Sequence, residues 1–168
     1  ALSNQVATEP NSVAGFPVDM GIRSLITGNA NYPMIMSRLT QGQSLQTSST
    51  RASNTSSSFA FDYNDGFMSG GGATTNLVAH MFRRAPGFFD VVAYEGDGTT
   101  GGIAHNLAAV PEMYWIKRTN YADGQGWMVY HKDAVATTAA NAQSSYLSLN
   151  STDTVAASTS RFGNIAPT

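Results

Sequence analysis

Cysteine is absent from this chain of 168 residues, which excludes disulfide bonds, thiolate metal ligands and cysteine nucleophiles. Charged residues are scarce, at 12% of the chain, or about half the share of an average globular protein. The formal net charge is -2, so the chain has no broad electrostatic attraction for a phosphate backbone. We therefore expect no nucleic-acid partner and a surface composed mainly of Ser, Thr, Asn and Gln.

Long apolar runs are also missing. No stretch of about 18 apolar residues occurs, and residues 1–12 lack the basic and then apolar pattern of a signal peptide. We expect no membrane insertion. Because Ala1 is not a methionine and the chain stops at Thr168 just after a strand-like run, we expect a processed product or a fragment of a longer protein.

Hydrophobic residues make up 42% of the chain, which is enough to build a real core. They occur in short runs rich in aromatic and β-branched residues, and Gly, Pro, Asn or Ser separates one run from the next. This spacing predicts β-strands joined by turns, and no helical periodicity survives the placement of Gly and Pro. The sequence therefore predicts an all-β fold, an antiparallel sandwich or a barrel. The strand-like runs are 34–36, 59–61, 77–82, 88–94, 113–116, 127–130 and 146–149.

The chain also contains an internal repeat. The motif at 18–20 resembles 111–113, the motif at 34–38 resembles 128–132, and Leu45 with its Ser/Thr tract up to Phe59 resembles Leu147 with its tract up to Phe162. The order and the near-constant spacing predict two tandem related units. The second has no counterpart of residues 65–82, so either the gene product is longer or another subunit supplies the missing strands.

The repeat predicts four segments. These are an N-terminal arm (1–14), a first β-sandwich unit (15–84), a connector that includes the first strand of the second unit (85–102), and a second β-sandwich unit that lacks its closing strands (103–168).

A specific family resemblance begins at residues 83–98, with the sequence RRAPGFFDVVAYEGDG. This stretch resembles a segment of marine phage and prophage virion structural proteins of the tail-fibre-like type. Further blocks follow in the order and near the spacing of that family: 104–107, 110–113, 116–118, 127–131, 146–147, 149–152 and 164–168. The first unit resembles the family through 16–20, 65–67 and 78–82. It departs from the family at 21–23, where Gly-Ile-Arg replaces a longer aromatic-rich strand.

The resemblance implies a concanavalin-A-like or laminin-G-like jelly roll. It also implies a non-enzymatic virion protein of the tail-fibre or receptor-binding type, which forms homo-oligomers, contacts other virion proteins and attaches to the host surface, where a glycan is a possible ligand. Two alternatives stay open: a capsid decoration protein, of the cement or fibre type, and a surface filament subunit assembled by strand exchange. A carbohydrate-degrading enzyme is a third and weaker reading, because it requires paired carboxylates in a cleft.

The residues that carry chemistry form no catalytic motif, and we predict no catalytic residue and no cofactor. His105 has no nucleophile elbow near it in sequence, and His80 and His131 alternate with apolar strand residues. Glu95 and Asp97 lie in a Gly-rich turn, so we interpret them as solvated turn residues.

Two ligand hypotheses remain. The aromatic residues Trp115, Tyr121 and Trp127 are candidates for stacking on a glycan. Asp62, Asn64 and Asp65 supply oxygen atoms at a spacing that suits calcium, but Asn-Asp-Gly is also an ordinary hairpin turn. We therefore predict no metal site other than this weak calcium candidate.

Overall fold

A computed structural model describes residues 12–26, 32–55, 59–69, 77–99, 101–120, 126–162 and 167–168. Twelve strands occur in these residues, and two short 3-10 helices, η1 (Arg38–Thr40) and η2 (Ala142–Ser144), are the only helical segments described. The strands are β1 (Ser12–Val13), β2 (Met20–Leu25), β3 (Met34–Ser37), β4 (Gln43–Gln46), β5 (Asn54–Thr55), β6 (Phe59–Ala60), β7 (Gly66–Ser69), β8 (Leu77–Phe82), β9 (Met113–Ile116), β10 (Met128–His131), β11 (Ser145–Ser148) and β12 (Ala156–Ala157).

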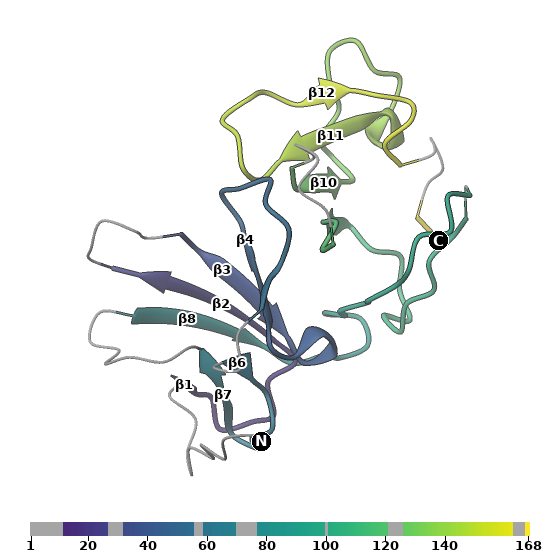
Figure 1. Cartoon of the computed structure of the whole chain (residues 1–168). Helices are drawn as coiled ribbons and strands as arrows, with labels where there is room; N and C mark the ends of the chain where they lie inside the picture. The colour runs from purple at the N-terminus through teal and green to yellow at the C-terminus, as the bar shows by residue number, and fades with distance from the viewer. Residues whose placement is uncertain are drawn as a thin grey trace.

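The strands form three antiparallel sheets (Figure 1). The first unit holds a five-stranded sheet, in the order β5-β4-β3-β2-β8, and a three-stranded sheet, in the order β1-β7-β6. The second unit holds a four-stranded sheet, in the order β12-β11-β10-β9. The predicted all-β antiparallel sandwich is confirmed, and the jelly-roll connectivity implied by the family resemblance stays a prediction.

The core of the first unit lies between its two sheets. Phe61 and Phe67 are fully buried, and their rings stack at 5.1 Å. Met36 of β3 and Val18 close the cluster from the larger sheet. A Cβ atom on Gly21 of β2 would overlap the Phe67 ring, so the absence of a side chain at this position lets the two layers approach each other.

The second unit repeats the ladder of the first, which confirms the two related units. Strands β9, β10, β11 and β12 follow one another as β2, β3, β4 and β5 do. The strand registers of the two units agree at three places. Gly21 lies opposite Met36 as Tyr114 lies opposite Tyr130. Ile35 lies opposite Leu45 as Val129 lies opposite Leu147, and Ser44 lies opposite Asn54 as Tyr146 lies opposite Ala156. Counterparts of β6, β7 and β8 are not found among the described residues of the second unit.

Backbone details outside the strands repeat as well. Gly15 before β2 has a φ of 74°, and Ala108 before β9 has a φ of 54°. The amide N–H of Arg38 donates to the carbonyl of Asp19 at 2.8 Å, as Lys132 N–H does to Glu112 at 2.9 Å. The chain therefore enters β2 and β9 through bends with the same left-handed φ, although this φ is unfavourable for alanine.

The connector differs from the prediction, because its run 88–94 forms no strand. Only an isolated bridge joins Ala85 and Phe89. The hydrogen bonds of this segment close local turns and bridge to a neighbouring loop instead. The Asp90 carboxylate accepts the N–H groups of Val91 at 2.9 Å and Asn106 at 2.6 Å. An apolar run without a neighbouring strand has no ladder to join.

The predicted N-terminal arm, residues 1–14, overlaps the first unit. Ser12 and Val13 form β1 and pair with β7. The N–H groups of Ala14 and Gly15 both donate to the carbonyl of Asp65. Residues 1–11 lie outside the described part of the chain.

Candidate functional site

The two units meet at the segment between β4 and β5. Three hydrogen bonds cross this junction: Trp127 Nε1 to Gln46 O at 2.7 Å, Ser53 N to Thr119 O at 2.8 Å, and Lys117 Nζ to Thr50 O at 3.3 Å. Figure 1 shows the end of β4 reaching the strands of the second unit. Each bond brings the polar Ser/Thr-rich segment against the second unit, so the units share an interface as well as a covalent connection.

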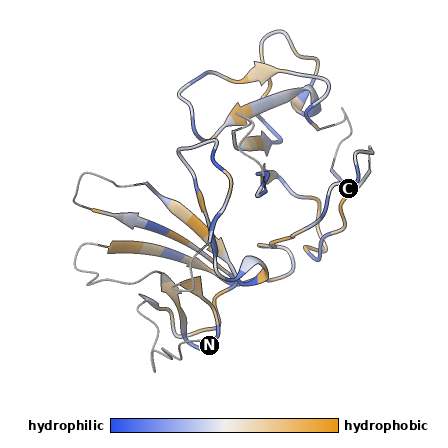
Figure 2. Cartoon of the chain, in the orientation of Figure 1, coloured by the Kyte–Doolittle hydropathy of each residue, from blue (hydrophilic) through white to orange (hydrophobic). Residues whose placement is uncertain are grey.

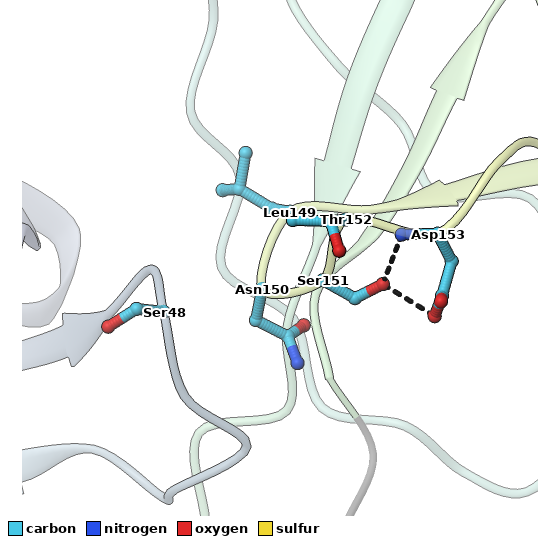
Figure 3. Close-up of a pocket in the computed structure, with 6 residues that line it drawn as sticks. All are labelled: Ser48, Leu149, Asn150, Ser151, Thr152 and Asp153. Carbon is cyan, nitrogen blue, oxygen red and sulfur yellow. Dashed lines mark hydrogen bonds between the residues drawn. The ribbon is translucent and has the colours of Figure 1, made fainter.

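An open pocket of about 460 Å³ lies at the junction. In Figure 3, Ser48 of the first unit lies across from the loop between β11 and β12. The hydroxyl of Ser151 donates to Asp153 Oδ2 at 2.5 Å and accepts the Asp153 N–H at 2.9 Å. These bonds fix the carboxylate close to the backbone of the loop. The residues that line the pocket are Ser48, Leu149, Asn150, Ser151, Thr152 and Asp153.

A second pocket of about 250 Å³ shares Asn150, Ser151 and Asp153 with the first. The Arg161 guanidinium lies 5.2 Å from the centre of the Tyr146 ring on one side of it. Asn150 Oδ1 accepts the Trp127 N–H at 2.9 Å. A Cβ on residue 126 would overlap the Asn150 amide, so a larger residue here would displace that side chain. The two pockets together present carboxylate, amide, hydroxyl and guanidinium groups next to an aromatic ring, which are the groups that hold polar organic ligands.

The three residues predicted to bind a glycan lie in different environments. Trp127 is buried, with 4% of its surface exposed, and its indole N–H is already bound to Gln46. Trp115 of β9 is 37% exposed and lines neither pocket. Tyr121 lies outside the described residues. The glycan role of these three residues stays a prediction, and only Trp127 lines one of the two pockets.

The pocket residues Tyr146, Asn150, Asp153 and Arg161 were not candidates in the sequence. Asn150 and Asp153 belong to the segment Leu-Asn-Ser-Thr-Asp at 149–153, which was visible only through the repeat and the family resemblance. A turn after a strand, rich in Asn, Ser and Asp, is the signal that could have indicated them.

The calcium candidates lie in the turn between β6 and β7. Asp62 Oδ1 accepts the Gln41 side-chain amide at 2.9 Å. The backbone carbonyl of Asp65 accepts two N–H groups from the segment that follows β1. In the described part of the chain, His, Asp and Glu do not gather in groups of three or more that could hold a metal. Calcium binding at Asp62, Asn64 and Asp65 stays a prediction.

Two of the three histidines hold turns. His105 Nδ1 accepts the Leu107 N–H, and His131 Nδ1 accepts the Asp133 N–H, both at 3.2 Å. Asp97 is bonded in the same way, because it accepts the N–H of Thr99 at 2.9 Å and its hydroxyl at 2.7 Å. These bonds lower the pKa of the Asp97 carboxyl. His80 is an exposed residue of β8.

One edge of the second sheet is open. β9 pairs with β10 on one side, and none of the described residues pairs with its other side, whereas the same side of β2 pairs with β8. Tyr114 of β9 stacks on Tyr130 at 4.7 Å, and the ring of Phe162 contacts both edge-on. Burial, with a smaller contribution from Tyr130, raises the pKa of Tyr114 to about 12.

Comparison with known proteins identifies the family. Residues 25–168 match the model of a family described as a domain of unknown function, DUF7483. The chain belongs to this family. The match covers every strand from β3 onward, and therefore both junction pockets and the open edge of β9. Neither the curated proteins nor the solved structures contain a match to the chain.

Within the described residues of this DUF7483 chain, no helix has the length and apolar character needed to cross a membrane.

Proposed function

We propose that this protein is a non-enzymatic structural component of a bacteriophage particle, of the tail-fibre or receptor-binding type. It acts by assembling with other subunits of the virion and by attaching to the host surface. The family resemblance of residues 83–168 supports the phage assignment.

The distribution of exposed apolar residues carries the assembly part of the proposal. Half of the large hydrophobic residues described as exposed lie between positions 88 and 115, from the connector to β9, and Phe88 is 73% exposed. Figure 2 shows hydrophobic stretches in this connection. Exposed apolar residues that gather into a patch commonly mark protein contacts, and these residues would supply such a patch for assembly. The residues are Phe88, Val92, Tyr94, Ile103, Val110, Met113 and Trp115.

The polar pockets at the junction support the attachment part. They offer Asn150, Asp153 and Arg161 at the surface, next to Tyr146. Weak contacts between such pockets and host-surface glycans add up when many copies are displayed on one particle, because each further contact forms at a high effective concentration.

A surface filament subunit is the second candidate, favoured by the open edge of β9. A capsid decoration protein is a further alternative, which would use the same apolar surface against the shell. Electron microscopy of native particles, labelled with an antibody against this chain, separates the three. Label on tail fibres supports the proposal, label on the capsid or along a filament supports an alternative, and label on no assembly overturns all of them.

Matched variants test the apolar surface directly. We expect Phe88→Ser to leave the melting temperature of the isolated protein unchanged and to reduce its incorporation into particles by about tenfold or more. Val135→Ser, at an exposed position outside the connector, is the control and is expected to assemble normally. Equal incorporation of the two variants would contradict an assembly role for the connector.

A further inference from the structure

The loop between β11 and β12 holds a carboxylate in a fixed orientation at the junction of the two units. Ser151 Oγ donates to Asp153 Oδ2 at 2.5 Å and accepts the Asp153 N–H at 2.9 Å. The carboxylate is therefore tied to its own loop through one oxygen, and Oδ1 is left to accept a hydrogen bond from a ligand. Hydroxyl groups bind strongly to such an oxygen, because its charge strengthens the hydrogen bond.

The Asn150 amide supplies the complementary donor. Its Oδ1 atom accepts the Trp127 backbone N–H at 2.9 Å. Since a backbone N–H can only donate, this bond determines which end of the amide faces the backbone, and Nδ2 is left to donate to a ligand. Gly126 leaves room for this arrangement, because a Cβ there would overlap the amide. Asn150 and Asp153 line both pockets, so a donor and an acceptor belong to one site.

The charges that line the pockets balance each other. In the described part of the chain, the charged lining residues are Asp153 and Arg161, one of each sign. The Arg161 guanidinium lies 5.2 Å from the centre of the Tyr146 ring, and Nη1 donates to Met128 Sδ at 3.5 Å. The guanidinium thus forms one wall of the smaller pocket. An anion would meet Asp153 and a cation would meet Arg161, so this site favours an uncharged ligand.

Adjacent hydroxyl groups of a sugar fit this set of groups. Each hydroxyl both donates and accepts, so one hydroxyl can donate to Asp153 Oδ1 while its neighbour accepts from Asn150 Nδ2. Leu149, which is 37% exposed, gives the larger pocket an apolar surface for the C–H groups of a sugar ring. The volume of that pocket, about 460 Å³, lies within the usual range of small-molecule sites.

We infer that the junction pockets bind a neutral sugar through two adjacent hydroxyl groups, one on Asp153 and one on Asn150, and that the bound sugar holds the two units together. The second part follows from Ser48, which belongs to the first unit and lines the same pocket as Asp153 (Figure 3). A sugar that fills this pocket contacts both units, so separating the units requires its release. The inference rests on the proposed attachment function and gives its ligand a chemical class.

Titration of the complete chain with single sugars tests the ligand class. The probes are the methyl glycosides of glucose, galactose, mannose and rhamnose, with glucuronic acid and glucosamine as charged counterparts. The readout is the shift of the amide NMR signals of residues 150–153. We expect at least one neutral sugar to bind with millimolar affinity, because so small a ligand makes few contacts, and neither charged sugar to match it. The absence of a shift with every neutral sugar, or equal binding of a charged sugar, would overturn the ligand class.

Two conservative variants test the binding groups. Asn150→Asp keeps the oxygen that accepts the Trp127 N–H and removes the amide donor, and Asp153→Asn keeps an acceptor for Ser151 and removes the charge. We expect each variant to weaken sugar binding by about tenfold or more and to melt close to the temperature of the unchanged protein. Asp133→Asn is the control, because this exposed carboxylate pairs with Lys132 outside both pockets. Equal sugar affinity of all three variants would overturn the site.

Hydrogen exchange at Ser53 tests whether the sugar holds the units together. The Ser53 N–H crosses the junction to Thr119 O at 2.8 Å, and Ser53 lines neither pocket. Because opening of the junction would release the sugar, a sugar concentration about ten times its Kd is expected to slow this exchange by about tenfold. Exchange at Ala14, whose N–H donates to Asp65 O within the first unit, is the control and is expected to stay unchanged. Unchanged exchange at Ser53 would overturn the bridging role.

Electron microscopy of labelled particles answers a separate question. A tail protein can lack a sugar site, and a protein with this sugar site can belong to another assembly. Failure of the sugar titration therefore leaves the particle assignment standing, and label on no assembly leaves the sugar site standing.

Discussion

The first and second units contain the same ladder of strands, β2 to β5 and β9 to β12, but they cover its inner face in two different ways. In the first unit, a second sheet lies over the ladder, and Phe61 and Phe67 reach from it into the core. In the second unit, the ladder's own tyrosines, Tyr114 and Tyr130, take that space, with Phe162 laid against them. A β-ladder can therefore keep its register while the means of covering it changes.

Gly21 and Tyr114 show how the difference is encoded. The two residues occupy the same place in the register. Glycine makes room for a ring from another strand, and tyrosine brings a ring of its own. A phenylalanine in the place of Phe67 could not lie over the second ladder in the same way without displacing Tyr114.

The largest expected effect comes from adding a methyl group at the closest approach of the two layers. Gly21→Ala places a Cβ against the Phe67 ring, which is fully buried and stacked on Phe61. Overpacking of this kind lowers the free energy of unfolding by roughly 1–3 kcal/mol, measurable by urea denaturation. Gly96→Ala is the control, because its Cβ would contact nothing within 4 Å. Equal stability of the two variants would mean that the layers are not packed tightly at Gly21.

A smaller effect is expected at the junction that joins the units. Trp127→Phe keeps most of the buried ring and removes the 2.7 Å hydrogen bond to Gln46 O. The loss leaves a carbonyl unpaired and lowers the free energy of unfolding by about 0.5–1.5 kcal/mol. We also expect the unchanged protein to unfold in one thermal transition and Trp127→Phe to unfold in two partly separated transitions, which calorimetry would detect. Trp115→Phe is the matched control outside the junction, and an identical effect of both variants would contradict the coupling.

The smallest effect is a dependence of stability on high pH. The pKa of Tyr114 is about 12 in the folded protein, above its ordinary value of 10, so folding favours the neutral phenol. The resulting stability is fully present below pH 10 and is lost as the pH rises from 10 toward 12. Thermal melting across this range should show the loss, and Tyr114→Phe should reduce it. A loss of the same size in both proteins would assign the effect to other groups.

The sequence predicted the strands of the ladder better than the connector and the junction around them. Met34 aligned with Met128 and Leu45 with Leu147, and these matches fall in β3 and β10 and in β4 and β11, in one register. All four residues are half-buried, and the matches were visible because half-buried strand positions favour apolar residues. Phe162, matched to Phe59 through the Ser/Thr tract, also packs on the inner face of its unit.

The sequence did not predict features that depend on contacts between residues distant in sequence. The run from Phe88 to Tyr94 has the composition of a strand and no ladder to join. The contact of Trp127 with Gln46 joins two different units, so nothing in the local pattern around either residue predicts it. The pocket residue Arg161 lies over the ring of Tyr146 in β11, and this contact between residues 15 positions apart belongs to no local motif.

The junction also determines how the protein transmits mechanical force. The units are held by two routes in parallel, the covalent connection of residues 85–112 and the hydrogen bonds made by residues 46–53. Under a tensile load on the second unit, we expect these three hydrogen bonds to break before the covalent connection of residues 85–112 is fully extended, and to form again when the load is released.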